Sequence, residues 1–160
     1  MIANLPPRNE LWVAVQEAHD YLHQWINDPS GRQHPQYGAI EFDVCDWGHR
    51  KEGGCVVCLG GLYYLHKAHK LLADDHDTWN SPVPPILRFL DHLRYPEDNA
   101  DEIEEWLGVE VDYDTRFIAD GCEWDTADPA HIQDFLWWLL ERGKEEGVYA
   151  PQTYTMPATK

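Results

Sequence analysis

The sequence predicts an α+β fold, a mostly helical single domain with a small β-sheet. Its 160 residues suit one hydrophobic core. Apolar residues recur at helical spacing in several stretches, whereas two short stretches alternate between apolar and polar residues as strands do. Eight Trp and eight Tyr supply large groups for packing. We expect one acidic domain over residues 1–147 and an extended C-terminal tail over residues 148–160.

The elements follow from these two periodicities and from residues that start or stop helices. Asn9 is a candidate N-cap for the first helix, after a Pro-Pro pair. The last helix has Asp128 as its cap, Pro129 at its first position and Gly143 after its end. Helices are predicted over residues 9–26, 55–73, 86–93, 100–107 and 129–142. The alternating stretches predict a sheet formed by residues 39–47 and 109–118.

The chain is strongly acidic, with a formal net charge of −17 at pH 7. Residues 97–160 contain 17 acidic and 4 basic residues, against 12 and 8 in residues 1–96. Direct binding of nucleic acid needs clustered Lys and Arg to displace counterions, and anionic membrane surfaces attract the same side chains. The composition therefore argues against both partners and favours a basic protein.

The compartment is predicted from the start of the chain and from its four cysteines. The first residues have no apolar core of a secretory signal, and no stretch approaches the roughly 20 apolar residues of a membrane span. Cysteines without a secretory signal favour a reducing compartment with free thiols or a bound metal. We therefore expect a cytoplasmic protein.

A compact group of cysteine and histidine residues is a candidate zinc site. Zinc binds thiolates and imidazoles in a tetrahedron, and the two pairs stand at either end of a predicted turn. Buried free thiols are the alternative, because apolar residues flank the second pair and free Cys is among the most buried residue types. A reactive dithiol is a further alternative. The candidate ligands are Cys45, His49, Cys55 and Cys58.

No complete catalytic motif is present. His66 and His69 share one side of a predicted helix, but the metalloprotease motif places two His four apart with Glu between them. A solvated polar surface is the expected role of this pair. Carboxylates are abundant, yet nothing singles out one pair as general acid and base. The sequence therefore favours a binding protein over an enzyme.

Acidic side chains are densest just after residue 96. Several lie on a predicted short helix, and others alternate along the predicted strand that follows. Carboxylates on one side of a strand repeat at roughly 6.5–7 Å, giving a regular line of negative charge that can imitate a DNA backbone. A solubilising surface is the alternative. The residues expected to bind a partner are Glu102, Glu105, Glu110, Asp112 and Asp114.

One segment resembles a known pattern. Residues 41–47 read Glu-Phe-Asp-Val-Cys-Asp-Trp, and residues 58–61 read Cys-Leu-Gly-Gly. They are similar to small uncharacterised phage and plasmid proteins in which Phe-Asp-Met-x-x-Trp precedes Cys-Gly-Thr-x-x-Cys-Ile-Ala-Gly. Gly53 stands at the first Cys of that pattern and Cys55 at its Thr. The resemblance implies a phage or mobile-element origin, where small acidic proteins often block host defences. The matching residues are Phe42, Asp43, Trp47, Cys58 and Gly61.

Together these observations predict a non-enzymatic acidic binding protein, a phage-encoded inhibitor that acts in the host cytoplasm. Its acidic surface would dock on a basic groove of a nucleic-acid-handling or defence protein. Two alternatives stay open: a zinc-binding module or small metal-dependent hydrolase, and a protein that holds a small ligand in an aromatic pocket. The last helix is apolar nearly all round, so Trp137 and Trp138 are candidates for a homo-oligomer interface.

Overall fold

The computed structural model describes residues 2, 4–43, 48–72, 83–93, 96–111 and 128–149, and for residues 96–98 the backbone alone. Within these ranges the chain forms five α-helices, a 3-10 helix η1 (Pro29–Arg32) and four strands, which confirms the mostly helical α+β fold. The helices are α1 (Arg8–Asn27), α2 (Leu59–Ala68), α4 (Pro85–His92), α5 (Pro96–Leu107) and α6 (Pro129–Glu145). The strands are β1 (Gln33–His34), β2 (Gly38–Phe42), β3 (His49–Lys51) and β4 (Gly54–Val57).

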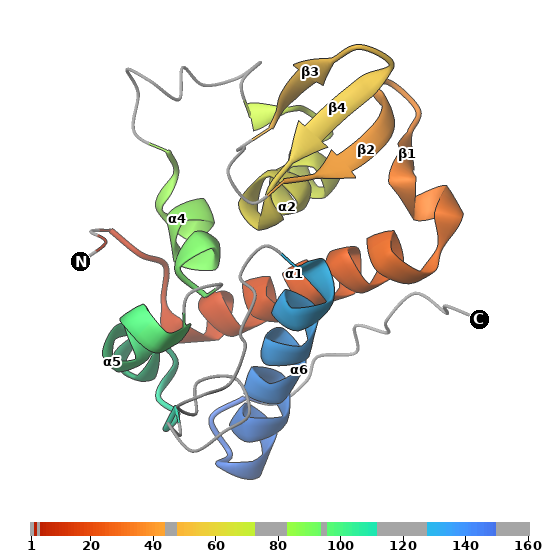
Figure 1. Ribbon diagram of the computed structural model, residues 1–160. Coiled ribbons are helices and arrows are strands. Elements are labelled where there is room, and N and C mark those ends of the chain that lie inside the picture. Colours follow the sequence, from red (N-terminus) through yellow and green to blue (C-terminus); the bar gives the residue numbers. More distant parts are fainter. Residues whose placement is uncertain are drawn as a thin grey trace.

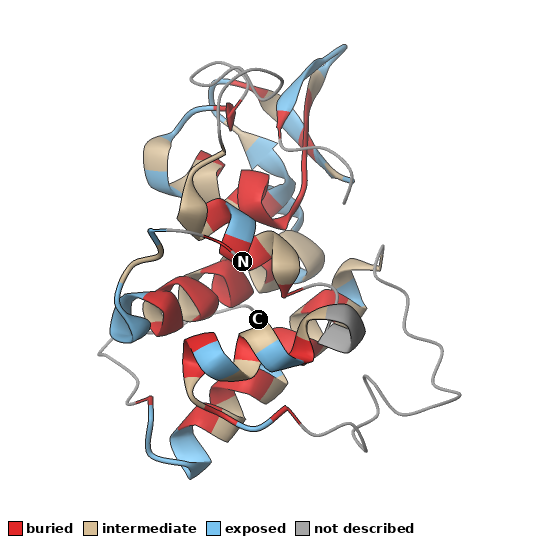
Figure 2. Ribbon diagram, turned by 90° about the vertical axis from the view of Figure 1, so that its left-hand side faces the viewer, coloured by how far each residue is buried: buried red, intermediate tan, exposed pale blue. Residues whose placement is uncertain are grey.

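Helix α1 crosses the middle of the molecule, with the sheet and α2 on one side and α5 and α6 on the other (Figure 1). The apolar residues that recur at helical spacing along α1 are buried from Leu11 to Leu22. Buried residues follow most of the length of this helix (Figure 2). The expected cap was wrong: Pro7 holds the N-cap position, and its carbonyl accepts the N–H of Glu10 at 2.9 Å. Asn9 therefore lies inside the first turn.

The sheet has the strand order β1-β2-β4-β3, with β2 and β4 parallel and the two outer pairs antiparallel. Gly54 begins β4 opposite Ala39, and a Cβ on it would overlap the backbone of Ala39. Only glycine allows the two strands to approach so closely. Because β4 is central, its residues from Cys55 to Val57 are all buried.

The predicted second helix started too early. Residues 55–57 form β4 instead, and α2 begins at Leu59. A short apolar run reads equally well as a buried strand or as a helix, and here the pairing with β2 decides between them. The segment expected to be a turn contains β3, which forms a hairpin with β4 around Glu52 and Gly53.

The predicted second strand of the sheet is absent from the described residues. Residues 109–111 form no strand, and residues 112–118 lie outside the described part of the chain. Val109 and Val111 are nevertheless buried while Glu110 is exposed. The alternation thus predicted which of these side chains are buried, but it did not predict the backbone conformation. The N–H of Val111 donates to the Glu104 carboxylate at 2.6 Å instead of to a neighbouring strand.

Helix α6 begins as predicted but ends later. The Asp128 side chain accepts the N–H of Ala130 at 2.9 Å, which confirms the cap. Gly143 lies inside the helix rather than after it, where it packs against Trp12. Tyr149, which follows the helix, is buried and stacks on Trp12 with ring centroids 5.2 Å apart. Residues 150–160 lie outside the described part.

Candidate functional site

The C-terminal end of α5 is held by side chains of α1. Arg8 donates from Nε to the carbonyl of Trp106 at 3.1 Å and from Nη2 to that of Glu105 at 3.0 Å. The indole N–H of Trp12 donates to the carbonyl of Leu107 at 3.0 Å. The last carbonyls of a helix have no intrahelical partner, and a cation there also opposes the helix dipole. The orientation of α5 on α1 is therefore well defined.

Acidic side chains of α5 lie on the surface that this anchoring presents. Asp101 and Glu105 are exposed and Glu102 is partly buried; Glu110, just beyond the helix, is exposed as well. We call these four residues the α5 acidic surface. Of the five residues predicted to bind a partner, the structure therefore places Glu102, Glu105 and Glu110 on or next to α5. The other two, Asp112 and Asp114, lie outside the described residues.

The side chains of the α5 acidic surface differ from several surface carboxylates of other elements in forming no ion pair with the described residues. Surface carboxylates of other elements form ion pairs at 2.9–3.1 Å, namely Glu17–Lys67, Glu41–Lys51 and Glu141–Lys144. Within the described residues, no member of the α5 acidic surface has such a partner. One carboxylate oxygen of Glu102 is also buried without a hydrogen-bond partner. Negative charge is thus concentrated here, with Arg8 as a cation at the adjacent C-terminal end of α5.

The structure describes three of the four proposed zinc ligands, Cys55, Cys58 and His49. Cys55 lies in β4, and Cys58 follows in extended conformation as the N-cap of α2, where its Sγ accepts the N–H of Gly61 at 3.4 Å. Side chains three apart in an extended chain leave opposite sides of it. His49 is exposed on β3, opposite Val56. Because Cys45 lies outside the described residues, the four-ligand site stays a prediction.

Both described cysteines, Cys55 and Cys58, are buried. Burial raises the pKa of the Cys55 thiol, and the nearby positive charge of Arg50 opposes this shift. A thiol with a raised pKa stays protonated and is a poor nucleophile. The described thiols therefore match the buried alternative more closely than a reactive dithiol.

The histidine pair on α2 is not a uniformly solvated surface. His69 is exposed at the C-cap, but His66 is partly buried and stacks on Tyr21 with ring centroids 4.3 Å apart. Burial, followed by the positive charges of His34 and His69, lowers the pKa of His66 to about 4. The ring is therefore neutral near pH 7.

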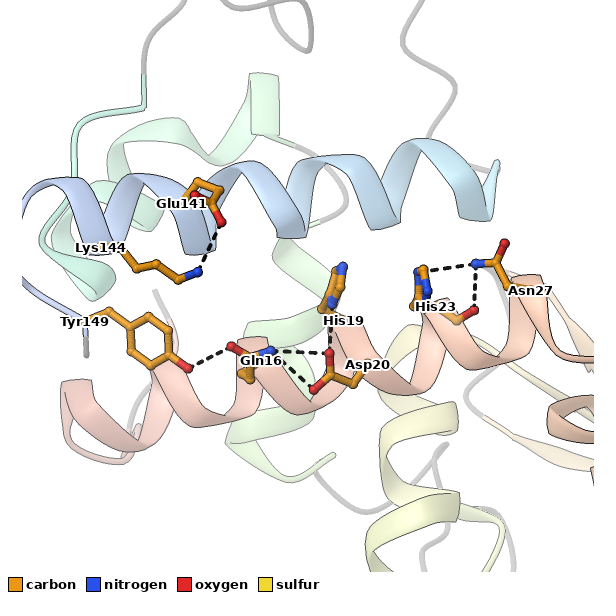
Figure 3. Close-up of polar contacts among 8 residues, drawn as sticks. All are labelled: Gln16, His19, Asp20, His23, Asn27, Glu141, Lys144 and Tyr149. Atoms are coloured by element: carbon orange, nitrogen blue, oxygen red, sulfur yellow. Dashed lines mark hydrogen bonds and ion pairs between the residues drawn. The ribbon is translucent and has the colours of Figure 1, made fainter. Parts of the chain in front are cut away.

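A buried polar network between α1 and α6 was missed in the sequence (Figure 3). His19 and Asp20 are almost completely buried, and His19 Nδ1 lies 3.0 Å from Asp20 Oδ1. Gln16 Nε2 donates to both oxygens of Asp20, at 3.3 and 3.2 Å, and the Tyr149 hydroxyl donates to Gln16 Oε1 at 2.9 Å. Each oxygen of the buried carboxylate therefore has a donor, as burial of a charge requires.

The sequence does contain a signal for this network. His19 and His23 are four apart on α1 with Asp20 directly after the first, a spacing shared with the H-E-x-x-H motif. Their rings stack with centroids 5.8 Å apart. Among the described residues, however, no group of three or more His, Cys, Asp or Glu side chains is arranged around one metal position.

The oligomer candidates on α6 differ in exposure. Trp137 is 46% exposed, whereas Trp138 is partly buried and stacks on Phe135 with centroids 5.9 Å apart.

The described part of the chain contains no helix with the length and apolar character of a membrane span. No family model, curated protein or solved structure matches the chain.

Proposed function

We propose that this protein binds a basic partner protein through the α5 acidic surface and has no catalytic role. The observation that carries the proposal is the cluster of carboxylates on α5 and at Glu110 that lacks ion-pair partners within the described residues. Ion pairing in water contributes little to stability, so unpaired surface charge is tolerated and stays available for a partner.

The anchoring of α5 supports this function. Arg8 and Trp12 hold its C-terminal carbonyls, so the helix that carries the carboxylates keeps its orientation without a partner. A rigid charged surface loses less conformational entropy on binding than a flexible one.

The partner class follows from the charge. Basic grooves long enough to match several carboxylates are typical of proteins that handle nucleic acid. We therefore propose a nucleic-acid-handling or defence protein of a bacterial host as the target, which the chain would inhibit by occupying that groove. The resemblance of residues 41–61 to phage and plasmid proteins supports this setting.

Charge reversal with a matched control tests the proposal. The tagged chain is used to capture proteins from a bacterial lysate, and the same is done with the double variants E105K/E110K and E52K/E145K. Both variants change the net charge equally at exposed positions, but only the first alters the α5 acidic surface. We expect a basic protein to be captured by the wild type and the control, to be lost from E105K/E110K, and to be displaced by excess duplex DNA.

Two results would contradict this function. Equal capture by both double variants would show that total charge, rather than the α5 acidic surface, attracts the partner. Capture that duplex DNA leaves unchanged would exclude a nucleic-acid groove as the binding site. Circular dichroism of each variant verifies that the fold is retained.

A further inference from the structure

We propose that the hairpin loop between β1 and β2 is a pH-sensitive latch, which is closed while the His34 ring is neutral and is released from α2 when the ring is protonated. His34 ends β1, and residues 35–37 turn the chain into β2. The hairpin and α2 lie on the same side of α1 (Figure 1). This device is separate from the α5 acidic surface and does not depend on the function proposed for that surface.

The loop is closed by a side-chain nitrogen. His34 Nδ1 accepts the N–H of Gln36 at 3.0 Å and that of Tyr37 at 3.3 Å. An Asx turn closes in a similar way, with a side-chain oxygen as the acceptor. A nitrogen that accepts hydrogen bonds carries no proton, so the neutral ring holds its proton on Nε2. Because both nitrogens of an imidazolium are donors, protonation removes the acceptor of both N–H groups.

Tyr37 connects the closed loop to the end of α2. Its side chain is buried, and the centroid of its ring lies 5.0 Å from that of the His34 ring. The Tyr37 hydroxyl accepts the N–H of Leu71, a fully buried residue just after α2, at 3.4 Å. A loop without its His34 hydrogen bonds therefore loses the turn that directs Tyr37 to this contact.

Groups from three neighbouring elements oppose the protonation of His34. His66 and His69 of α2 are close enough for their charges to act on His34 and on each other. Arg50 of β3 lies 4.8 Å from the centre of the loop tyrosine ring, and Arg32 of η1 donates to the last turn of α1. Within the described residues, no carboxylate forms an ion pair with His34.

These surroundings give the latch its direction. Burial, followed by the positive charge of His69, lowers the pKa of His34 from 6.5. In the open loop the ring is solvated and its pKa returns toward the ordinary value, so the open form binds the proton more tightly than the closed one. The latch is therefore closed above pH 6.5 and opens as the pH falls below this value.

Hydrogen exchange of the full chain at pH 7.5 and pH 5.5, measured by mass spectrometry and corrected for the chemical exchange rate, tests the latch. In the wild type we expect protection over residues 33–39 to fall by about tenfold at pH 5.5, the ratio of protonated to neutral imidazole at an ordinary pKa, while α6 stays protected. His34→Asn keeps an acceptor for the loop but does not titrate, so its loop should be equally protected at both pH values. His131→Gln, which removes a histidine of α6, is the matched control and should behave as the wild type.

A second measurement on the wild type serves if His34→Asn fails to fold. Long-range proton–nitrogen correlation spectra report which imidazole nitrogen carries the proton, and for His34 at pH 7.5 we expect Nε2. The latch is refuted if this proton lies on Nδ1, if the wild-type loop is equally protected at both pH values, or if His34→Asn loses as much protection as the wild type. An equal loss of protection in α6 would show acid unfolding of the whole domain and would also refute it.

Discussion

Asp20 shows what a single buried carboxylate requires. An ionised carboxylate without partners in a protein interior is destabilising by several kcal/mol, but Asp20 receives hydrogen bonds from His19 and Gln16. Burial and the charge of Asp20 raise the pKa of Tyr149, so its hydroxyl keeps the proton that it donates to Gln16. The network thus joins the residues after α6 to the middle of α1.

At the same scale, His66 makes the fold sensitive to acid. Its pKa is lowered to about 4 from 6.5, so between these values the unfolded chain binds the proton more readily than the folded one. The contribution of the neutral His66 ring to the free energy of unfolding is complete above pH 6.5 and is lost as the pH falls toward 4. Allowing for the partial exposure of the ring, we expect a loss of about 1–2 kcal/mol.

Carboxylates ordinarily gain protons over part of the same pH range. The effect of His66 is therefore measured as a difference between the wild type and a variant that lacks this histidine. The free energy of unfolding from urea denaturation is compared between wild type and His66→Gln from pH 7.5 to 4.5. The wild type should lose more stability than the variant as the pH falls. His131→Gln on α6 is the control, and parallel curves for wild type and His66→Gln would contradict the assigned pKa shift.

At the scale of elements, α1 and α6 approach closely at one glycine. A Cβ on Gly143 would lie 2.7 Å from Trp12 Cη2 and 3.0 Å from Tyr149 Cβ. Trp12 is fully buried, and its indole is held by Leu107. Alanine is favoured over glycine in a helix by about 1 kcal/mol, but overpacking opposes this. We expect Gly143→Ala to destabilise the protein by about 1–2 kcal/mol net.

A double-mutant cycle separates these two effects. Trp12→Phe removes the ring atoms that the new methyl group would meet, although it also loses the hydrogen bond to Leu107. If overlap with Trp12 is the cause, Gly143→Ala is less destabilising in the Trp12→Phe background than in the wild type. Equal effects in the two backgrounds would locate the strain elsewhere. Chemical denaturation provides all four free energies.

At the scale of the whole molecule, charge repulsion is the main unfavourable term that the sequence reveals. A net charge of −17 destabilises the compact state, and salt screens such repulsion over about 10 Å at 0.1 M. We expect the urea midpoint to rise between 0.05 and 0.5 M NaCl. E105K/E110K should be more stable than wild type at low salt and should gain less from added salt. A midpoint that falls with salt would show that ion pairs such as Glu17–Lys67 outweigh the repulsion.

Several features were determined by the sequence alone because they depend on neighbours along the chain. The periodicity of α1 predicted its buried side, and Asp128 with Pro129 predicted where α6 begins. Net charge and its concentration after residue 96 are properties of composition, which folding leaves unchanged. The exposure of Glu110 between the buried Val109 and Val111 also followed from local alternation.

Other features were decided only by the tertiary structure, because each depends on a residue far away in the chain. Residues 55–57 became a strand through pairing with β2, although periodicity in such a short apolar run does not separate a strand from a helix. The anchoring of α5 needs Arg8, nearly a hundred positions earlier. The polar network around Asp20 needs Tyr149, and periodicity reports which side of a helix is buried but not what covers it. Long-range packing therefore made an ordinary-looking His-Asp pair on α1 part of a buried polar network.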